Sequence, residues 1–141
     1  SFSACFGSAF LMLDPIVYAN ELTRKMKQHN AEAWLVNTGW TGGPVNTGTR
    51  IDLPVTRKII NAILSGSLDN AEFKTLPVFN LSIPLKIGEV DSNILEPAKA
   101  WGSPIKWHIA ATDLALKFIN NFSKFCTNDE TILLTEFGPR I

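Results

Sequence analysis

Three observations predict a protein of the α/β class, a mixed sheet with flanking helices. The first is the length of 141 residues, which suits one domain. The second is the composition, in which 45% of the residues are hydrophobic and 18% are charged, as a folded core requires. The third is the alternation of helical periodicity with short β-prone runs, without internal repeats. These observations exclude an intrinsically disordered chain, which needs low hydrophobicity and high net charge.

The charge balance narrows the function classes. Thirteen basic side chains face 13 acidic ones, for a formal net charge of +0. Nucleic acids and anionic membrane surfaces attract proteins with a positive excess, so neither partner is expected. No apolar run approaches the roughly 18 to 20 residues that span a bilayer, so the sequence predicts a soluble protein.

Residues 1–13 are mostly small or apolar and contain no initiator Met. A secretory signal peptide has a similar apolar core, but the basic region that precedes such a core is missing here. We therefore expect an internal segment that packs against an upstream part of a longer protein. Cys5 lies in this segment and could form one disulfide with Cys126. The main expectation is two free thiols, which fits a reducing, cytoplasmic compartment.

The first helix is predicted over residues 15–29. Asp14 is a suitable N-cap, and Pro15 follows at the first helical position, where no backbone N–H is needed. Asn30 is expected to end the helix. The apolar side chains that recur every four positions are Tyr18, Leu22 and Met26. A short apolar run over residues 33–37 then fits a buried strand.

The next predicted pair of elements is a loop and a second helix. The loop over residues 38–50 is dense in glycine and threonine. Asp52 and Pro54 open the helix in the same way as Asp14 and Pro15 open the first, and the Ser65-Gly66 pair ends it. Its predicted apolar stripe is Ile59, Ile60, Ile63 and Leu64.

Short strands are predicted over residues 71–84, where Pro77 and Pro84 confine them to short or edge positions. Residues 85–102 are predicted to be irregular, and the longest helix begins at the Ser103-Pro104 pair and runs to about residue 126. Its predicted apolar stripe is Trp107, Ala111, Leu114, Phe118, Phe122 and Phe125. Because these few short strands make a small sheet, we expect an incomplete one that borrows strands from sequence outside the chain.

A strand, a glycine-rich loop and a helix opening in succession are typical of a nucleotide or anion site. The loop matches neither the Walker A pattern nor the dinucleotide-binding pattern. Arg50 can stack on an aromatic ring or fork onto an oxyanion, and Thr56 can present a hydroxyl from the first helical turn. A plain connection remains open, with Arg50 paired to Asp52 and Thr56 bonded to the local backbone. The sequence contains no complete catalytic constellation and no metal-ligand spacing, so neither kind of site is predicted in it.

Several segments are similar to one known family. They are FSACFG at 2–7, AWLVNTGWTGGP at 33–44, Arg50-Ile51 with Thr56-Arg57, IINAILSGSLDN at 59–70, Leu95-Glu96-Pro97 and GPRI at 138–141. With these segments the chain resembles the C-terminal part of ATP-dependent phosphoenolpyruvate carboxykinase over essentially its whole length. The segment around residues 37–40 is highly characteristic of that family.

The resemblance implies a cytoplasmic carboxy-lyase of gluconeogenesis. Such an enzyme converts oxaloacetate and ATP to phosphoenolpyruvate, ADP and carbon dioxide with Mg²⁺ and Mn²⁺. It has a two-domain α/β fold, in which residues 1–141 would be the incomplete C-terminal part of the nucleotide-binding domain. The family's phosphate-binding loop, metal ligands and substrate-binding arginines would lie in the upstream part of the same polypeptide, so the segment alone is not expected to be active. The alternative is a stand-alone nucleotide- or partner-binding module derived from that domain.

The resemblance also implies nucleotide contacts at Arg50, Ile51 and Thr56. Arg50 and Ile51 would flank the adenine, and Thr56 would form a hydrogen bond near it. Two positions depart from the family: Thr49 stands where a lysine is frequent, and Asp52 follows Ile51. A carboxylate so close to a polyphosphate is unfavourable unless it faces away or caps the next helix.

The apolar start of the chain separates the two hypotheses. A stand-alone module should bury Phe2, Phe6 and Phe10, within itself or in an oligomer. A fragment would leave part of that surface unpaired.

Overall fold

The computed structural model of the chain describes residues 8–141. The helices are α1 (Pro15–His29), α2 (Leu53–Leu64), α3 (Ser92–Leu95), α4 (Pro97–Ala100), α5 (Pro104–Phe122) and α6 (Asp129–Leu133). The strands are β1 (Trp40–Thr41), β2 (Thr49–Arg50), β3 (Phe73–Leu76) and β4 (Leu81–Pro84). Short 3-10 turns lie at η1 (Ser8–Phe10), η2 (Ser123–Phe125) and η3 (Leu134–Phe137). The α/β class is confirmed, and the described strands form two antiparallel pairs, β1 with β2 and β3 with β4.

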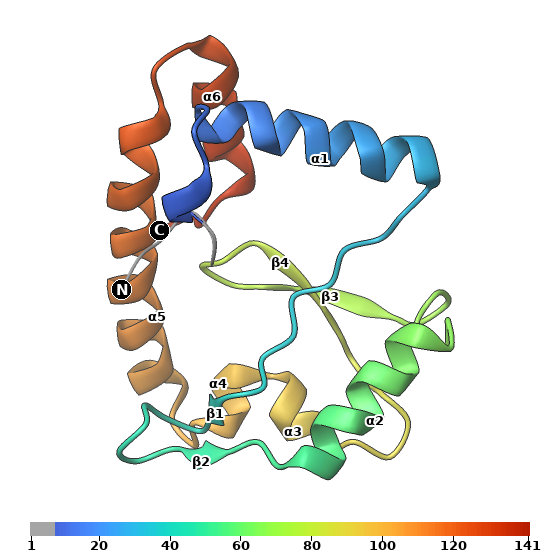
Figure 1. The fold of residues 1–141 in the computed structure, drawn as a ribbon. Helices are drawn as coiled ribbons and strands as arrows, with labels where there is room; N and C mark the ends of the chain where they lie inside the picture. The colour runs from blue at the N-terminus through green and yellow to red at the C-terminus, as the bar shows by residue number, and fades with distance from the viewer. Residues whose placement is uncertain (1–7) are drawn as a thin grey trace.

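Helix α1 has the predicted bounds, for the predicted reasons. The Asp14 carboxylate accepts the N–H of Ile16 at 3.0 Å, and Asn30 ends the helix in the left-handed conformation with φ 49°. The predicted apolar stripe does not form a core, because no residue along this fully described helix is buried. Figure 1 shows α1 crossing one end of the molecule, near α6 and away from the two hairpins.

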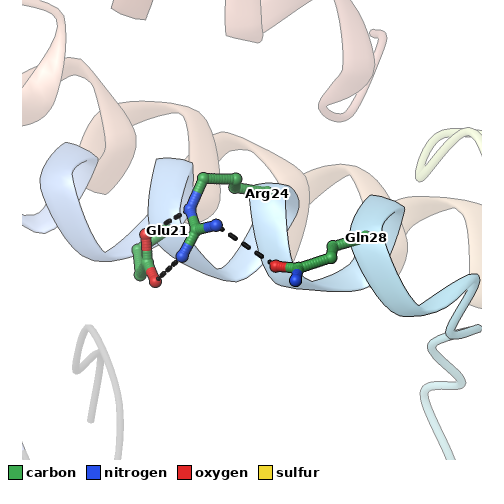
Figure 2. Close-up of polar contacts among 3 residues, drawn as sticks. All are labelled: Glu21, Arg24 and Gln28. Carbon is green, nitrogen blue, oxygen red and sulfur yellow. Dashed lines mark hydrogen bonds and ion pairs between the residues drawn. The ribbon is translucent and has the colours of Figure 1, made fainter.

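Polar contacts along α1 are mostly local. Arg24 donates two hydrogen bonds to Glu21, at 2.6 and 2.8 Å, and one to Gln28 at 3.2 Å (Figure 2). Hydrogen bonding from Arg24 lowers the pKa of Glu21 below its ordinary value. Side chains three and four positions apart stabilise a helix by a few tenths of a kcal/mol per pair, on the order of 0.2–0.5. Asn20 makes the contact to a distant element, a 3.0 Å hydrogen bond to Glu130 of α6.

Residues 31–39 connect α1 to β1 in an extended course that passes the β3–β4 hairpin (Figure 1). The strand predicted over residues 33–37 is not paired: no backbone hydrogen bond joins residues 32–36 to another residue of the described part of the chain. Leu35 is 86% exposed, whereas Trp34 is half-buried with its ring centroid 6.0 Å from that of Phe73. The alternation of inward and outward side chains is that of a strand, but the described residues provide no neighbour for its edges.

Helix α2 and the segment after β4 share one core cluster. Leu68, Ile87 and Val90 are buried at its centre. The half-buried side chains around them are Trp34, Val55, Ile59, Ala62, Ile63, Ala71 and Leu95. Part of the predicted α2 stripe is therefore confirmed, and the Ser65-Gly66 pair ends the helix as predicted, with Gly66 at φ 69°.

Helix α5 carries the second core cluster. Trp107 and Ala111 pack with Leu76 of β3, surrounded by Val78, Phe79, Ile83, Ala98 and Trp101. The predicted stripe is buried only in its first half, since Leu114 is 42% exposed and Phe118 is 45% exposed. Phe118 still contacts the Phe79 ring, with the two rings nearly perpendicular and their centroids 6.5 Å apart.

Two further predictions are adjusted by the structure. Residues 85–102 contain α3 and α4 rather than only irregular chain, because Asp91 caps α3 and a proline begins α4. Cys126 is a free, half-buried thiol, whereas Cys5, Phe2 and Phe6 lie outside the described residues. None of the described helices is both long and apolar enough to cross a membrane.

Candidate functional site

The predicted site residues lie on and beside the β1–β2 hairpin. In its register Trp40 faces Arg50 and Thr41 faces Thr49. The turn is closed by the N–H of Gly48, which donates to the Pro44 carbonyl at 2.7 Å. The pairing continues past the strands, where the Ile51 N–H donates to the Gly39 carbonyl at 2.8 Å. The loop that the sequence predicts is therefore an ordered hairpin.

Close backbone packing explains the glycines at two positions of this hairpin. A Cβ on Gly48 would overlap the Gly43 carbonyl oxygen and lie 2.7 Å from the Thr41 carbonyl oxygen. Gly42 has φ 75°, and a Cβ there would lie 3.0 Å from the carbonyl oxygen of Ala100 in α4. Glycine is the residue that allows both the tight turn and the approach to α4.

Asn37 fixes the start of the hairpin. Its Oδ1 accepts the N–H of Gly39 at 2.9 Å, and its Nδ2 donates to the carbonyl oxygen of Trp40 at 3.1 Å. One side-chain amide thus holds the two residues whose backbones pair with Ile51 and Arg50. Asn side chains commonly bond to nearby backbone in turns of this kind.

The departure at Asp52 is explained by the opening of α2. The Asp52 Oδ1 accepts the N–H of Val55 at 2.8 Å, so the carboxylate caps the helix. A capping carboxylate accepts a hydrogen bond from a backbone N–H that has no partner within the helix, and its negative charge interacts favourably with the positive end of the helix dipole. Asp52 is therefore structural, and no ion pair joins it to Arg50 among the described residues.

The three predicted nucleotide contacts lie within one short stretch but in different environments. Arg50 is exposed on β2, and its side chain makes no hydrogen bond or ion pair with the part of the chain that the structure describes. Ile51 is buried, with 8% of its surface exposed. Thr56 is half-buried in the first turn of α2, and its hydroxyl donates to the Asp52 carbonyl at 3.1 Å. The local backbone bond considered for Thr56 is thus present, whereas the Arg50–Asp52 pair is not.

Behind Ile51 lies a cavity of about 720 Å³, bounded by residues 32–37, α2 and the β3–β4 hairpin. Its walls are mainly apolar, and its polar residues are Glu32, Asn37, Asp69 and Ser82. No lysine or arginine lines it, so a phosphate group would find no cation there. Arg50 and Thr56 lie outside its lining.

An ion-pair cluster supports α4, the helix that the Gly42 loop approaches. Glu96 binds Lys74 of β3 at 2.6 Å and Lys99 of α4 at 2.8 Å. The hydrogen bond from Lys74, followed by that from Lys99, lowers the pKa of Glu96 below its ordinary value. Its side chain is 23% exposed. The cluster therefore joins the β3–β4 hairpin to α4, the helix that the β1–β2 hairpin approaches at Gly42.

Two features of this site are absent from the sequence predictions. Asn37 lies in the segment that marks the family resemblance. Its two hydrogen bonds, to Gly39 and to Trp40, exist only in the folded loop and cannot be predicted from the spacing of these residues. The cavity beside Ile51 also depends on elements far apart in sequence. Within residues 8–141, no group of three His, Cys, Asp or Glu side chains is arranged to hold a metal ion.

Comparison with protein families gives one finding for this chain. A family model described as phosphoenolpyruvate carboxykinase matches residues 1–93. The matched range contains the β1–β2 hairpin, α2 and the three predicted contact residues, and it ends within α3.

Proposed function

The chain belongs to the ATP-dependent phosphoenolpyruvate carboxykinase family, and from this premise we propose that it supplies adenine-nucleotide contacts of such an enzyme. Arg50 and Ile51 flank the adenine, and the Thr56 hydroxyl forms a hydrogen bond near it. The complete enzyme decarboxylates oxaloacetate and phosphorylates the resulting enolate with ATP, in the cytoplasm, as a step of gluconeogenesis. Residues 1–141 form the C-terminal part of the nucleotide-binding domain of this two-domain protein.

The observation that carries this proposal is the position of Arg50. Its guanidinium is exposed on an ordered hairpin and makes no interaction with the described residues, although carboxylates lie close by in sequence. A planar cation held in this way can stack on the face of a purine. The neighbouring Ile51 is fixed by its backbone bond to Gly39, and its side chain is buried beside the cavity.

The charges around α2 favour a base over a polyphosphate. Helix N-termini attract phosphates through unpaired N–H groups. At α2 the Asp52 carboxylate already accepts a hydrogen bond from one of these groups, the N–H of Val55, and its negative charge repels a phosphate. The cavity behind Ile51 has no cationic lining residue. The phosphate groups are therefore assigned to the upstream part of the same polypeptide.

Mg²⁺ and Mn²⁺ are assigned to the upstream part as well. The described residues do not fit a metal site, since no three suitable side chains converge. Divalent ions of this kind are held by oxygen ligands together with the substrate phosphates. No step of the reaction is derived from metal ligands in this chain.

The exposure of the early apolar residues agrees with a place inside a longer protein. Phe10 is 86% exposed and Met12 is 89% exposed. An apolar surface of this kind marks a contact with other protein. The stand-alone module would have to cover the same surface by self-association.

The test uses the full-length protein that carries this chain. It is assayed for phosphoenolpyruvate formation from oxaloacetate and ATP, and the Arg50→Ala variant is compared with it. We expect the KM for ATP to rise about tenfold while kcat changes little, because stacking of a guanidinium contributes on the order of 0.5–2 kcal/mol to binding. Arg57→Ala, an equal loss of charge on the exposed side of α2, is the matched control and should leave both constants unchanged.

Three results would contradict the proposal in different ways. A protein that binds ATP through Arg50 but forms no phosphoenolpyruvate would be a nucleotide-binding module. A protein that is active but unaffected by Arg50→Ala would place the adenine elsewhere. A protein that neither binds ATP nor turns over oxaloacetate would refute the function entirely.

A further inference from the structure

We propose that Asn37 is a positioning residue for the nucleotide site and that it acts through Arg50 and Ile51. This inference rests on the proposed function and extends it to a residue that does not touch the nucleotide. Its side-chain amide is a hydrogen-bonded link between the extended segment after α1 and the hairpin that presents Arg50.

The first path runs from Asn37 to Ile51. The Oδ1 of Asn37 holds the N–H of Gly39 at 2.9 Å, and the carbonyl of the same Gly39 accepts the N–H of Ile51 at 2.8 Å. The Gly39 residue is thus fixed on both sides. Its position sets where the Ile51 backbone leaves the hairpin and enters α2.

The second path runs from Asn37 to Arg50. The Nδ2 of Asn37 donates to the carbonyl oxygen of Trp40 at 3.1 Å, and Trp40 is the cross-strand partner of Arg50. Each strand of this ladder has two residues, so few other bonds hold the pair, and we expect the loss of one anchor to change its twist. The direction of the Arg50 side chain therefore depends on the Asn37 amide.

Gly48 fixes the other end of the same ladder. Any side chain there would overlap the Gly43 carbonyl oxygen, so the turn keeps its present form only with glycine. The hairpin is thus held by an amide at its open end and by backbone packing at its turn. Arg50 lies between these two anchors, two residues after Gly48.

The experiment measures binding of ATP with Mg²⁺ and of inorganic tripolyphosphate to the full-length protein by calorimetry. The variants are Asn37→Asp, which keeps the Oδ1 acceptor but replaces the Nδ2 donor, and Asn46→Asp as the matched control. Asn46 is exposed in the same loop, and its side chain makes no hydrogen bond with the described residues. Its change therefore adds the same charge without altering the Asn37 clamp, the pair of hydrogen bonds from the Asn37 amide to Gly39 and Trp40.

We expect Asn37→Asp to weaken ATP binding about fivefold, since one hydrogen bond contributes modestly to an equilibrium. Tripolyphosphate binding should be unchanged, because the Asn37 clamp acts on Arg50 and Ile51, which are assigned to the adenine and not to the phosphates. In the Arg50→Ala background the Asn37→Asp change should have little further effect, as expected for residues that act through one another. Asn46→Asp should bind both ligands as the unmodified protein does.

Each other result overturns the inference. Equal weakening of ATP and tripolyphosphate would mean that Asn37 has a general structural role. Unchanged ATP affinity, with Arg50→Ala still weakening it, would leave the proposed function standing and remove Asn37 from it. A full-length protein that does not bind ATP would refute the proposed function, and the inference would fall with it.

Gly48→Ala tests the other anchor by the same measurement. It should weaken ATP binding more than Asn37→Asp does, because a backbone overlap cannot be relieved by a side-chain rotation. Gly138→Ala is its control, since a Cβ there meets its nearest neighbour, the Thr135 carbonyl oxygen, at 3.3 Å. An unchanged affinity in Gly48→Ala would show that the turn does not determine the position of Arg50.

Discussion

Helix α1 and helix α5 both begin with a capping side chain and a proline in the first helical turn. Both carry apolar residues at helical spacing, and both have the predicted start. Yet α5 buries Trp107, Ala111 and Ala115, whereas α1 buries no residue. The difference lies in their neighbours: α5 packs on α4 and the β3–β4 hairpin, and the described residues give α1 little more than a hydrogen bond to α6.

The comparison shows that local signals and packing determine different properties. Caps, a proline at the start and helical spacing determine where a helix begins and ends. Burial requires an apolar surface on another element, and most of a helix's stability in a folded protein comes from such packing. Helix α1 therefore has its shape without a core, and the comparison makes predictions about stability that differ between the two helices.

The largest expected difference is between core substitutions. Trp107→Ala should lower the free energy of unfolding by about 3–5 kcal/mol, because Trp107 is only 7% exposed and packs in the second core cluster. Leu22→Ala on α1 should change it by less than about 0.5 kcal/mol, since Leu22 is 62% exposed. Urea denaturation of the full-length protein measures both. A cost at Leu22 similar to that at Trp107 would mean that α1 is covered in the complete protein.

A smaller difference is expected between the two N-caps. Asp14→Ala and Ser103→Ala each remove an acceptor, for the N–H groups of Ile16 and Lys106, and each should cost the helix about 1 kcal/mol. For α5 this cost should appear in global unfolding, because the helix is part of the core. For α1 it should appear only as faster hydrogen exchange in its first turns. Exchange measured by mass spectrometry distinguishes the two patterns, and a global loss from Asp14→Ala would contradict the comparison.

The smallest effect is a dependence on pH. Glu21 and Glu96 both have lowered pKa values, through hydrogen bonds from Arg24 and from Lys74. A carboxyl with a lowered pKa stabilises the folded state above its ordinary pKa, near 4.5, and this contribution is lost as the pH falls through the folded value. Glu96→Gln should therefore lower the thermal midpoint at pH 7 and match the unmodified protein in acid.

Glu21→Gln is the companion variant for this pH test. Its ion pair is more than half exposed on α1 and joins residues of one helix, so its effect should be smaller than that of Glu96→Gln, which separates β3 from α4. Thermal melts of both variants over pH 3–7 give the comparison. An equal effect of the two substitutions would show that an ion pair between separate elements stabilises the fold no more than an ion pair within one helix.

The sequence predicts those parts of the fold that depend on neighbouring residues. Asp14, Asp52 and Ser103 cap their helices as expected, because a cap involves residues two or three positions away. The short α3 and α4 are missed, although Asp91 and Pro97 carry the same signal, since helices of four residues show no periodicity. The α1 stripe is predicted as the apolar side of an amphipathic helix, and none of its residues is buried by the described residues, because periodicity does not identify a partner.

The candidate site divides in the same way. Arg50, Ile51 and Thr56 are identified by the family resemblance, and their assignment to the nucleotide stays a prediction. The clamp at Asn37 requires the folded loop, in which one amide reaches both Gly39 and Trp40. The sequence around an exposed asparagine before a glycine-rich loop is the same whether or not its side chain bonds to the loop backbone.

The extended course of residues 32–36 also has a consequence for proteolysis. Proteases bind their substrates as extended strands and need backbone groups that are free to pair with the enzyme. Residues 32–36 offer such groups without prior unfolding, and Leu35, at 86% exposure, suits an enzyme that cleaves after large apolar residues. Wherever this segment is left uncovered, the first cut in the chain should fall there and release α1 from the two hairpins.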